Sequence, residues 1–217
     1  MYPHGDPLTC DPLRNLSLAE HRSVCVGPEA RQRHGRCASG SRLCAVSMGE
    51  PWMAEVLRAG DLTLRAFGPG DAEELHEIFS DPATHSIGDG PIRDLAATRD
   101  WLRRRVERRE QYGVTWYGVR TANGDLIGNA GLFIGRTGDE PELGFEIRFA
   151  DQNHGFGSRA AGVVAAEGHR AGFARIWATV RARNVSSLHA LARVGFVQDR
   201  VESHSRGDLV YLLHEDR

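Results

Sequence analysis

The residues Gln152-Asn153-His154-Gly155-Phe156-Gly157 separate an extended apolar run from a helical one. A loop that leads into a helix leaves several backbone N–H groups without partners at the helix start. The helix dipole adds about half a positive charge there, so the position attracts phosphate groups. Gly155 and Gly157 carry no Cβ, which lets a pyrophosphate approach the backbone closely. The segment predicts a phosphate site, with a plain strand–loop–helix corner as the alternative.

The second half of the chain must position this loop. Its pattern predicts strands over 142–149, 174–180, 196–201 and 209–213. One helix is expected over 158–171. A second follows Asn184, a suitable N-cap, carries Leu188, Leu191 and Val194, and ends at Gly195.

The first half predicts strands over 62–67, 114–120 and 125–134. Asn123-Gly124 between the last two is a strong hairpin signal. Asp71 and Glu74 form a capping box for a helix with Leu75, Ile78 and Phe79 on one face. An arginine-rich helix is expected over 94–110, with Leu95, Leu102 and Val106 inward. Its arginines could steer an anion, but the spacing of Arg103 and Glu107 favours a solvated, paired face. The elements together predict a mixed α+β sheet rather than a doubly wound one.

Composition excludes several classes of protein. The chain has 217 residues and a net charge of −2, so no overall field favours nucleic acid or a membrane surface. All 27 basic residues are arginine, which excludes a lysine Schiff base or a P-loop lysine. Neither an apolar span nor a secretory signal is apparent, so the cytoplasm is the expected location.

Residues 1–50 are expected to be a disordered extension, and 58–217 the folded domain. The first segment is rich in Gly, Pro, Ser, Arg and His and lacks any regular apolar period. Met48 and Met53 allow for a later start of translation. The four cysteines (Cys10, Cys25, Cys37 and Cys44) match no zinc spacing, even with His4, His21 and His34 nearby. No metal is implied.

This order of elements resembles the GNAT N-acetyltransferase superfamily. The resemblance rests on Gln152-x-x-Gly155-x-Gly157 and on Asn184-x-x-Ser187 with Gly195-Phe196 closing the next helix. With the opening Leu62-Thr63-Leu64-Arg65 and the helix after Asp71, these motifs are similar to the RimJ/RimL-like branch. The resemblance covers about residues 61–214.

The resemblance implies a three-layer fold whose twisted, mostly antiparallel sheet carries helices on both faces. Strands 142–149 and 174–180 would lie parallel and splay apart, with acetyl-CoA in the wedge. Backbone groups near Ile147 and Phe149 would pair with the pantetheine arm as a further strand does. The pyrophosphate would bind backbone N–H groups of Gln152, Asn153, His154, Gly155, Phe156, Gly157 and Ser158.

The resemblance also implies catalytic roles. Glu142 is the leading general base, with Glu146 on the same strand face as a reserve; a solvent-facing strand glutamate is the alternative for Glu142. Ser187 would donate to the leaving thiolate, or else bond the backbone of its own helix turn. Many members carry a tyrosine seven residues after the asparagine, where this chain has Leu191. Asn184 would bond the cofactor arm, cap its helix, or do both.

Other polar and aromatic residues receive more modest predictions. His154 is expected to help hold phosphate or to be exposed. Glu202 and His204 are expected to reach the acceptor pocket, whereas Trp116, Tyr117 and Trp177 are expected in the core.

The predicted function is transfer of acetyl from acetyl-CoA to a primary amine in a ternary complex. The acceptor is a protein N-terminus or a small molecule; Asp81, Asp89 and Asp94 would favour a cationic amine, or are ordinary loop acids. A non-catalytic acyl-CoA sensor is the alternative, and it could dispense with Glu142. A dinucleotide site is disfavoured because G-x-G-x-x-G is absent. Oligomeric state stays open, a homodimer included.

Overall fold

The computed structural model describes residues 52–85 and 90–216. Within these residues the strands are β1 (Val56–Ala59), β2 (Leu62–Ala66), β3 (Trp116–Arg120), β4 (Leu126–Ile134), β5 (Pro141–Ile147), β6 (Arg175–Arg181), β7 (Val197–Glu202) and β8 (Leu209–Glu215). The helices are α1 (Ala72–Phe79), α2 (Leu95–Tyr112), α3 (Phe156–Arg170) and α4 (Val185–Arg193), with short 3₁₀ turns η1 (Pro69–Asp71) and η2 (Phe149–Asp151).

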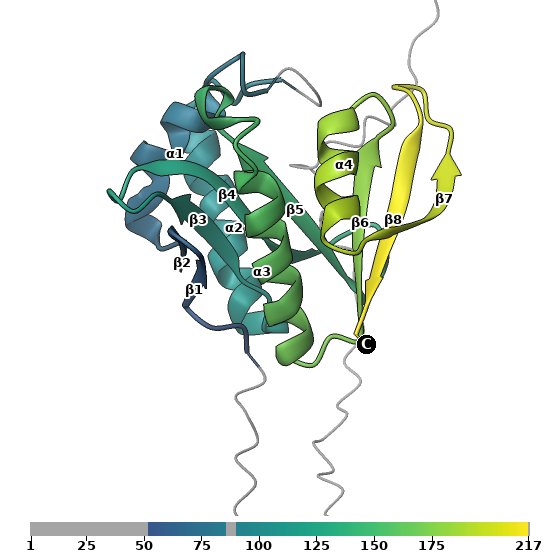
Figure 1. Ribbon diagram of the computed structural model, residues 1–217. Coiled ribbons are helices and arrows are strands. Elements are labelled where there is room, and N and C mark those ends of the chain that lie inside the picture. Colours follow the sequence, from purple (N-terminus) through teal and green to yellow (C-terminus); the bar gives the residue numbers. More distant parts are fainter. Residues whose placement is uncertain (1–51, 86–89, 217) are drawn as a thin grey trace, which may run out of the picture. The chain divides into compact units, whose positions relative to one another are not determined.

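One sheet carries all eight strands of the described chain, in the order β1-β2-β3-β4-β5-β6-β8-β7 (Figure 1). The predicted hairpin is confirmed: β3 and β4 pair antiparallel across Asn123-Gly124, and Gly124 has the positive φ of +92° that such a turn requires. The sequence pattern missed β1, which pairs with β2. Packing accordingly begins upstream of residue 58, because Met53 is already buried against the core.

Helices cover both faces of the sheet, as the mixed α+β prediction expected. In Figure 1, α3 and α4 lie in front of the sheet, and α1 and α2 lie behind its β3–β4 region. The larger core lies under α3 and includes Leu64, Tyr117, Leu132 and Ile176. A second core, on the α1–α2 side, is built from residues such as Leu75, Leu102 and Trp116. The two cores fix the central strands from both sides.

Strands β5 and β6 are parallel and separate after a single register pair, Glu142 with Trp177. Strand β6 instead pairs with β8 along its whole length, from Arg175 to Arg181. The splay expected between these strands is therefore confirmed, and in Figure 1 they diverge towards the top of the view. One edge of β5 is left without a neighbouring strand over most of its length.

The capping box predicted for α1 is wrong. The Asp71 carboxylate makes no bond to the first turn of α1. It turns back to accept from the Gly68 N–H at 2.7 Å and from Arg65 at 2.5 Å. Glu74 pairs with Arg120 instead. Arg120 on β3 takes up the Glu74 carboxylate, and the Asp71 carboxylate is shared between Arg65 on β2 and the Gly68 N–H, so neither caps the first turn of α1.

The arginine-rich helix has the predicted solvated pair, but of its three predicted inward residues only Leu102 is buried, whereas Leu95 and Val106 are half-buried. Asp94 caps α2 by accepting from Ala96 N–H at 2.9 Å. Arg103 and Glu107 form an exposed i,i+4 pair at 2.9 Å. Leu102 is the buried apolar residue of this helix.

Several predictions fall outside the described residues: the disordered extension 1–50, its cysteines and histidines, the alternative start at Met48, and Asp89. No helix of the described ranges is long and apolar enough to cross a membrane. Those ranges also contain no cluster of His, Cys, Asp or Glu that could hold a metal ion.

Candidate active site

The glycine loop leads into α3, and two of its residues have a left-handed backbone conformation. Asn153 has φ +65° and Gly155, the N-cap of α3, has φ +78°. No side chain of the described residues caps this helix. The first intrahelical bond of the turn runs from Arg159 N–H to Gly155 C=O at 3.1 Å. The N–H groups of Phe156, Gly157 and Ser158 therefore point out of the helix start without an intrahelical acceptor.

Gln152 shapes this loop from within. Its backbone N–H donates to Phe149 C=O at 3.2 Å, and its side-chain amide donates to Ile147 C=O at 2.9 Å. Both donors are thus engaged, so Gln152 holds the loop against the end of β5. The predicted binding of phosphate by its N–H would require the bond to Phe149 to open.

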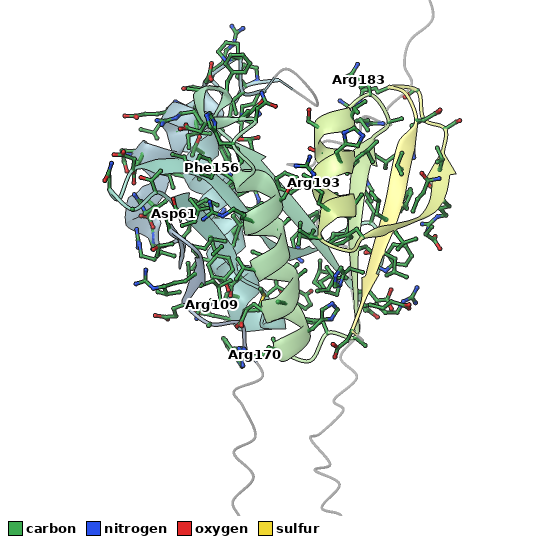
Figure 2. The ribbon with its side chains drawn as sticks, in the orientation of Figure 1. Asp61, Arg109, Phe156, Arg170, Arg183 and Arg193 are labelled. Atoms are coloured by element: carbon green, nitrogen blue, oxygen red, sulfur yellow. The ribbon has the colours of Figure 1, made fainter. Side chains whose placement is uncertain are left out.

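His154 is exposed on the outer side of the loop. Its Nδ1 lies 3.3 Å from Asp151 C=O, and its ring stacks on Phe156 with centroids 5.7 Å apart. This placement agrees with the expectation of an exposed residue near the helix start. Figure 2 labels Phe156 and Arg170, which mark the two ends of α3.

Gly157 lies close to β5 in the first turn of α3. A Cβ at this position would lie 2.9 Å from the Phe145 ring, a distance that side chains do not tolerate. Glycine here therefore serves helix–strand packing as well as access to the helix start. Any larger residue must displace Phe145 or the start of α3.

The open edge of β5 offers backbone groups for an added strand. Strand residues present their N–H and C=O groups alternately to opposite edges. Arg148 N–H donates to Ile127 C=O on β4. Because residues alternate, the backbone N–H and C=O groups of Phe145 and Ile147 point to the β6 side. Ile147 C=O is engaged by Gln152, and Phe149 N–H donates to the Thr84 hydroxyl at 2.9 Å. The Phe145 groups and Ile147 N–H are the ones left facing the gap.

Glu142 is fully buried, with 0% of its surface exposed. Its Oε1 accepts from the backbone N–H groups of Arg136 and Thr137, the latter at 3.3 Å. Its Oε2 accepts from the Thr179 hydroxyl at 3.0 Å. The solvent-facing alternative for Glu142 is therefore wrong. The carboxylate holds the β4–β5 turn and joins β5 to β6, and its role as a base stays a prediction.

Glu146 lies further along the same face of β5 and is half-buried. Its Oε1 is 3.2 Å from Nε2 of His85, whose ring packs edge-on against Phe79. The reserve candidate thus contacts His85 and lies four residues nearer the open end of the splay than Glu142. In the sequence, only its even spacing from Glu142 pointed to Glu146.

Asn184 caps α4 as predicted: its side chain accepts from Ser187 N–H at 3.2 Å. The Ser187 side chain is half-buried, and no described residue is bonded to its hydroxyl. This hydroxyl is thus available to a bound molecule. Leu191, at the position of the usual tyrosine, is buried in the larger core.

Thr179 is a site residue that sequence reasoning missed. Besides bonding Glu142, its hydroxyl accepts from Arg136 at 3.2 Å, and its register partner on β8 is Tyr211. Burial and a hydrogen bond with Glu202 raise the pKa of Tyr211. Glu202 lies within 3.6 Å of His204. Glu202 is therefore linked through Tyr211 to the strand of Thr179, and the reach of Glu202 and His204 into an acceptor pocket stays a prediction.

The remaining predictions concern three aromatic residues and two loop acids. Trp116, Tyr117 and Trp177 are all buried, as expected for core residues. Asp81 accepts bonds from the Thr84 and Ala83 N–H groups of its own turn, and Asp94 caps α2. Both acids therefore serve their own turn or helix cap, as the ordinary-loop-acid alternative expected, and their binding of a cationic amine stays a prediction.

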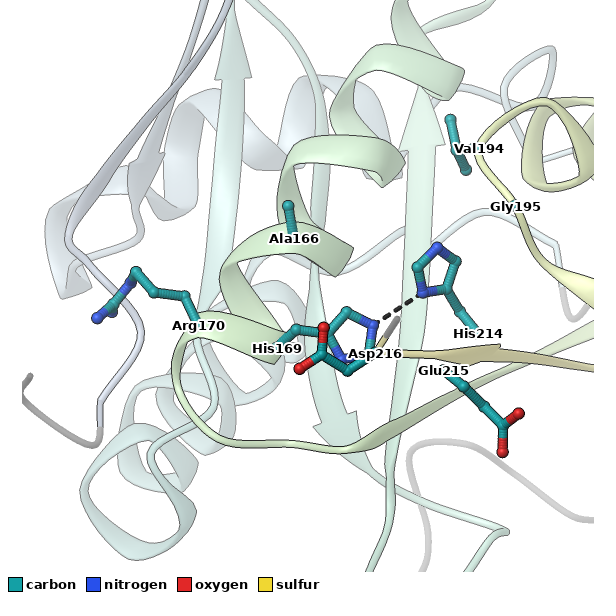
Figure 3. Close-up of a pocket in the computed structure, with 8 residues that line it drawn as sticks. All are labelled: Ala166, His169, Arg170, Val194, Gly195, His214, Glu215 and Asp216. Carbon is teal, nitrogen blue, oxygen red and sulfur yellow. Dashed lines mark hydrogen bonds between the residues drawn. The ribbon is translucent and has the colours of Figure 1, made fainter.

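A second concave region lies at the opposite end of α3 from the glycine loop. It has a volume of about 570 Å³ and is lined in part by His169, Gly195 and His214 (Figure 3). The two imidazoles bond at 2.8 Å, and Nδ1 of His169 donates to Phe173 C=O at 2.6 Å. The residues predicted for cofactor binding do not line it, so it is not the expected phosphate site.

Comparisons with known proteins agree with this geometry. Residues 61–197, more than half of the chain, match the family model described as the acetyltransferase (GNAT) domain. No curated protein matches the chain. The chain therefore belongs to the GNAT acetyltransferase family, and acetyl transfer is its class of reaction.

Solved structures share the fold at low sequence identity. RimL, a ribosomal L7/L12 α-N-protein acetyltransferase in complex with coenzyme A, superposes with TM-score 0.67 and 16% identity over 74% of this chain and 98% of that one. The ribosomal-protein-S5-alanine acetyltransferase from Vibrio fischeri gives 0.63 and 22%, covering 74% and 96%. A GNAT-family acetyltransferase from Bacillus anthracis gives 0.63 and 21%, covering 74% and 98%.

Proposed function

We propose that this protein is a RimJ/RimL-like N-acetyltransferase that transfers acetyl from acetyl-CoA to a primary amine. The observation that carries the proposal is the splay of β5 from β6 beside the uncapped start of α3. The free N–H groups of Phe156, Gly157 and Ser158 would bind the pyrophosphate. The free edge of β5 at Phe145 and Ile147 would bind the pantetheine arm as an added strand. Coenzyme A in the RimL structure supports this cofactor.

The chemistry requires one proton to leave the amine and one to reach the departing thiolate. Glu142 is too enclosed to touch an amine directly, but Thr179 bridges it to the outer side of the sheet. In the proposed path the amine gives its proton to the Thr179 oxygen while the hydroxyl proton passes to Glu142 Oε2. As the amine nitrogen bonds the thioester carbon, the C–S bond breaks and the Ser187 hydroxyl donates a hydrogen bond to the departing sulfur. The proton taken up by Glu142 then returns through solvent to complete the thiol.

The acceptor is a protein N-terminus or a small-molecule amine in the cytoplasm. Two of the solved structures are named for ribosomal-protein substrates, which supports the first choice. A non-catalytic acyl-CoA sensor would use the same splay and loop. The arrangement of Thr179, Glu142 and Ser187 favours an enzyme.

Calorimetric titration of the full chain with acetyl-CoA tests the proposal first, with NAD as the comparison. We expect micromolar binding of acetyl-CoA and none of NAD. A folded protein that gives no heat with acetyl-CoA would refute the proposed site.

Turnover then separates the enzyme from the sensor. Chromatographic measurement of CoA release is the readout, because the chain's own cysteines interfere with thiol reagents. We expect Glu142→Gln and Thr179→Val to lower kcat by about 100-fold or more while acetyl-CoA binding is kept. Wild-type protein without turnover on any amine would support the sensor instead.

A further inference from the structure

Arg105 occupies an aromatic cage on the side of the sheet opposite α3. Its Cζ lies 4.8 Å from the ring centre of Trp101, 4.9 Å from that of Trp116 and 5.1 Å from that of Phe133. The rings come from α2, β3 and β4, so three elements hold one guanidinium. Such contacts stabilise a cation by electrostatic attraction to the ring faces.

No acidic side chain of residues 52–85 and 90–216 neutralises this cation. Its Nε is buried and makes no hydrogen bond within that part of the chain. Other arginines of α2 are paired, such as Arg103 with Glu107 and Arg109 with Glu55. Burial lowers the pKa of Arg105 to about 10, and the nearby charges of Arg104 and Arg108 add to the effect. The group still carries its charge at neutral pH.

The ring faces stabilise this enclosed cation in part, and an anion from another molecule would supply the counter-ion that the described residues lack. The terminal nitrogens of Arg105 differ from Nε in that they are not sealed from solvent. A guanidinium presents its donors in a planar fork that fits a carboxylate with two parallel bonds. The cage holds this fork in place before any ligand arrives.

The cage lies next to the proposed reaction centre. Phe133 is the register partner of Glu142 across β4 and β5. A Cβ built on Gly135 would lie 2.6 Å from the Phe133 ring and 2.5 Å from Glu142 Oε1. The Glu142 carboxylate and the Arg105 guanidinium therefore both lie near the Phe133 ring.

We propose that Arg105 binds a carboxylate of the acceptor, so that the substrate is an amine that also carries an acidic group. This inference rests on the proposed N-acetyltransferase function. Arg105 and Glu142 both lie near the Phe133 ring, and no ion pair joins them among the described residues, so several bonds would separate amine from carboxylate in such an acceptor. An ω-amino acid or a protein N-terminus followed by an acidic residue has this chemistry.

Matched acceptor pairs test the inference with the full-length protein. One set consists of ω-amino acids and their carboxamides, and the other of dipeptide amides with Asp or Asn as the second residue. We expect the acid of a pair to exceed its amide by about tenfold or more in kcat/KM. The set that shows this preference distinguishes a small-molecule source from a protein N-terminus. Equal rates for acid and amide in both sets would overturn the inference but leave acetyl transfer intact.

Variants assign the preference to one residue. We expect Arg105→Met to remove it by lowering turnover of the acids alone, and Arg105→Lys to restore part of it. Arg103→Met is the matched control, because it removes an exposed arginine from the same helix. A preference that persists in Arg105→Met would refute the role of Arg105.

A binding measurement keeps the inference testable even without turnover. Glutarate, a dicarboxylate that lacks an amine, is titrated calorimetrically into wild type, Arg105→Met and Arg103→Met. We expect millimolar binding in wild type and Arg103→Met, lost in an Arg105→Met protein whose circular dichroism shows that it is folded. Absence of glutarate binding to wild type would count against Arg105 as an anion site, whereas failure of acetyl-CoA to bind would count against the proposed function.

Discussion

Individual side chains in this protein often serve the fold and the candidate chemistry together. Glu142 closes a turn and links two strands, yet it also lies next to the splay through Thr179. Asn184 caps a helix and places Ser187 at its first turn. A substitution at such residues therefore needs both a stability and a binding measurement.

Gly157→Glu should abolish acetyl-CoA binding. The new side chain would push against Phe145, only 2.9 Å from its Cβ, and would put a negative charge at the helix start. Calorimetry with acetyl-CoA is the measurement. Gly70→Glu is the control, since a Cβ there meets nothing within 4 Å. Normal binding by a folded Gly157→Glu protein would contradict the proposed phosphate site.

Glu167→Gln should destabilise the protein in a pH-dependent way. The buried carboxylate bonds Ala54 N–H at 2.5 Å and Arg170 at 2.6 and 2.7 Å. Burial alone raises its pKa, but the hydrogen bonds from Arg170 and Ala54 outweigh burial and bring the pKa below the ordinary value of 4.5. A lowered folded-state pKa contributes stability above pH 4.5, and this stability is lost as pH falls through the folded pKa.

Urea unfolding checks this prediction. We expect Glu167→Gln to lose about 1–3 kcal/mol at pH 7 and progressively less below pH 4.5. Glu107→Gln, at an exposed pair, should change stability by less than about 0.5 kcal/mol. An effect of Glu167→Gln that does not vary with pH would contradict the assignment.

At the scale of elements, the candidate site depends on where strands and helices end. β5 ends at η2, the chain turns through Asn153 and Gly155, and α3 starts with its N–H groups free. α4 starts on the other side of the splay with its own cap at Asn184. The uncapped start of α3 and the Asn184-capped start of α4 would therefore both face a cofactor held between β5 and β6.

Substitutions at Asn184 separate capping from cofactor binding. Asn184→Ala should lose about 1 kcal/mol of stability, whereas Asn184→Asp should keep the cap and the stability. If Asn184 also bonds the cofactor arm through its amide, acetyl-CoA affinity falls in both variants. Urea unfolding and calorimetry on the same proteins give the two readouts. Full stability of Asn184→Ala would contradict the capping role.

At the scale of the whole molecule, the sheet is nearly divided at the splay. β1 to β5 are held by α1, α2 and α3, whereas β6, β7 and β8 form a separate ladder that meets β5 at one register pair. The larger core continues under both parts through residues such as Ile147 and Ile176. A ligand bound along the open edge of β5 would add contacts that the chain itself lacks there.

Acetyl-CoA should therefore raise the thermal midpoint of the whole domain. At ~100 times its dissociation constant, a ligand that binds only the folded state stabilises it by about 2.7 kcal/mol. For a domain of this size that corresponds to a shift of roughly 5–10 °C. Differential scanning fluorimetry measures it, with NAD and the Gly157→Glu protein as controls. No shift in wild type would contradict cofactor binding in the splay.

The sequence determined the features that depend on neighbouring residues. Asn123-Gly124 predicted the hairpin, Asn184 the cap of α4, and the glycine loop the start of α3, because each is settled by contacts within a few positions along the chain. The order of strands and helices likewise indicated the mixed α+β sheet, whereas its splayed pair was expected only from the family resemblance.

Only the tertiary structure decided the environment of the charged groups. Thr179 is 37 residues from Glu142, and the rings around Arg105 come from three different elements. The capping box assigned to Asp71 and Glu74 was wrong for a similar reason. Glu74 pairs with Arg120 on β3, and Asp71 pairs with Arg65 on β2. Burial and charge pairing arise from residues brought together across the sheet, and no local pattern in the chain encodes which ones meet.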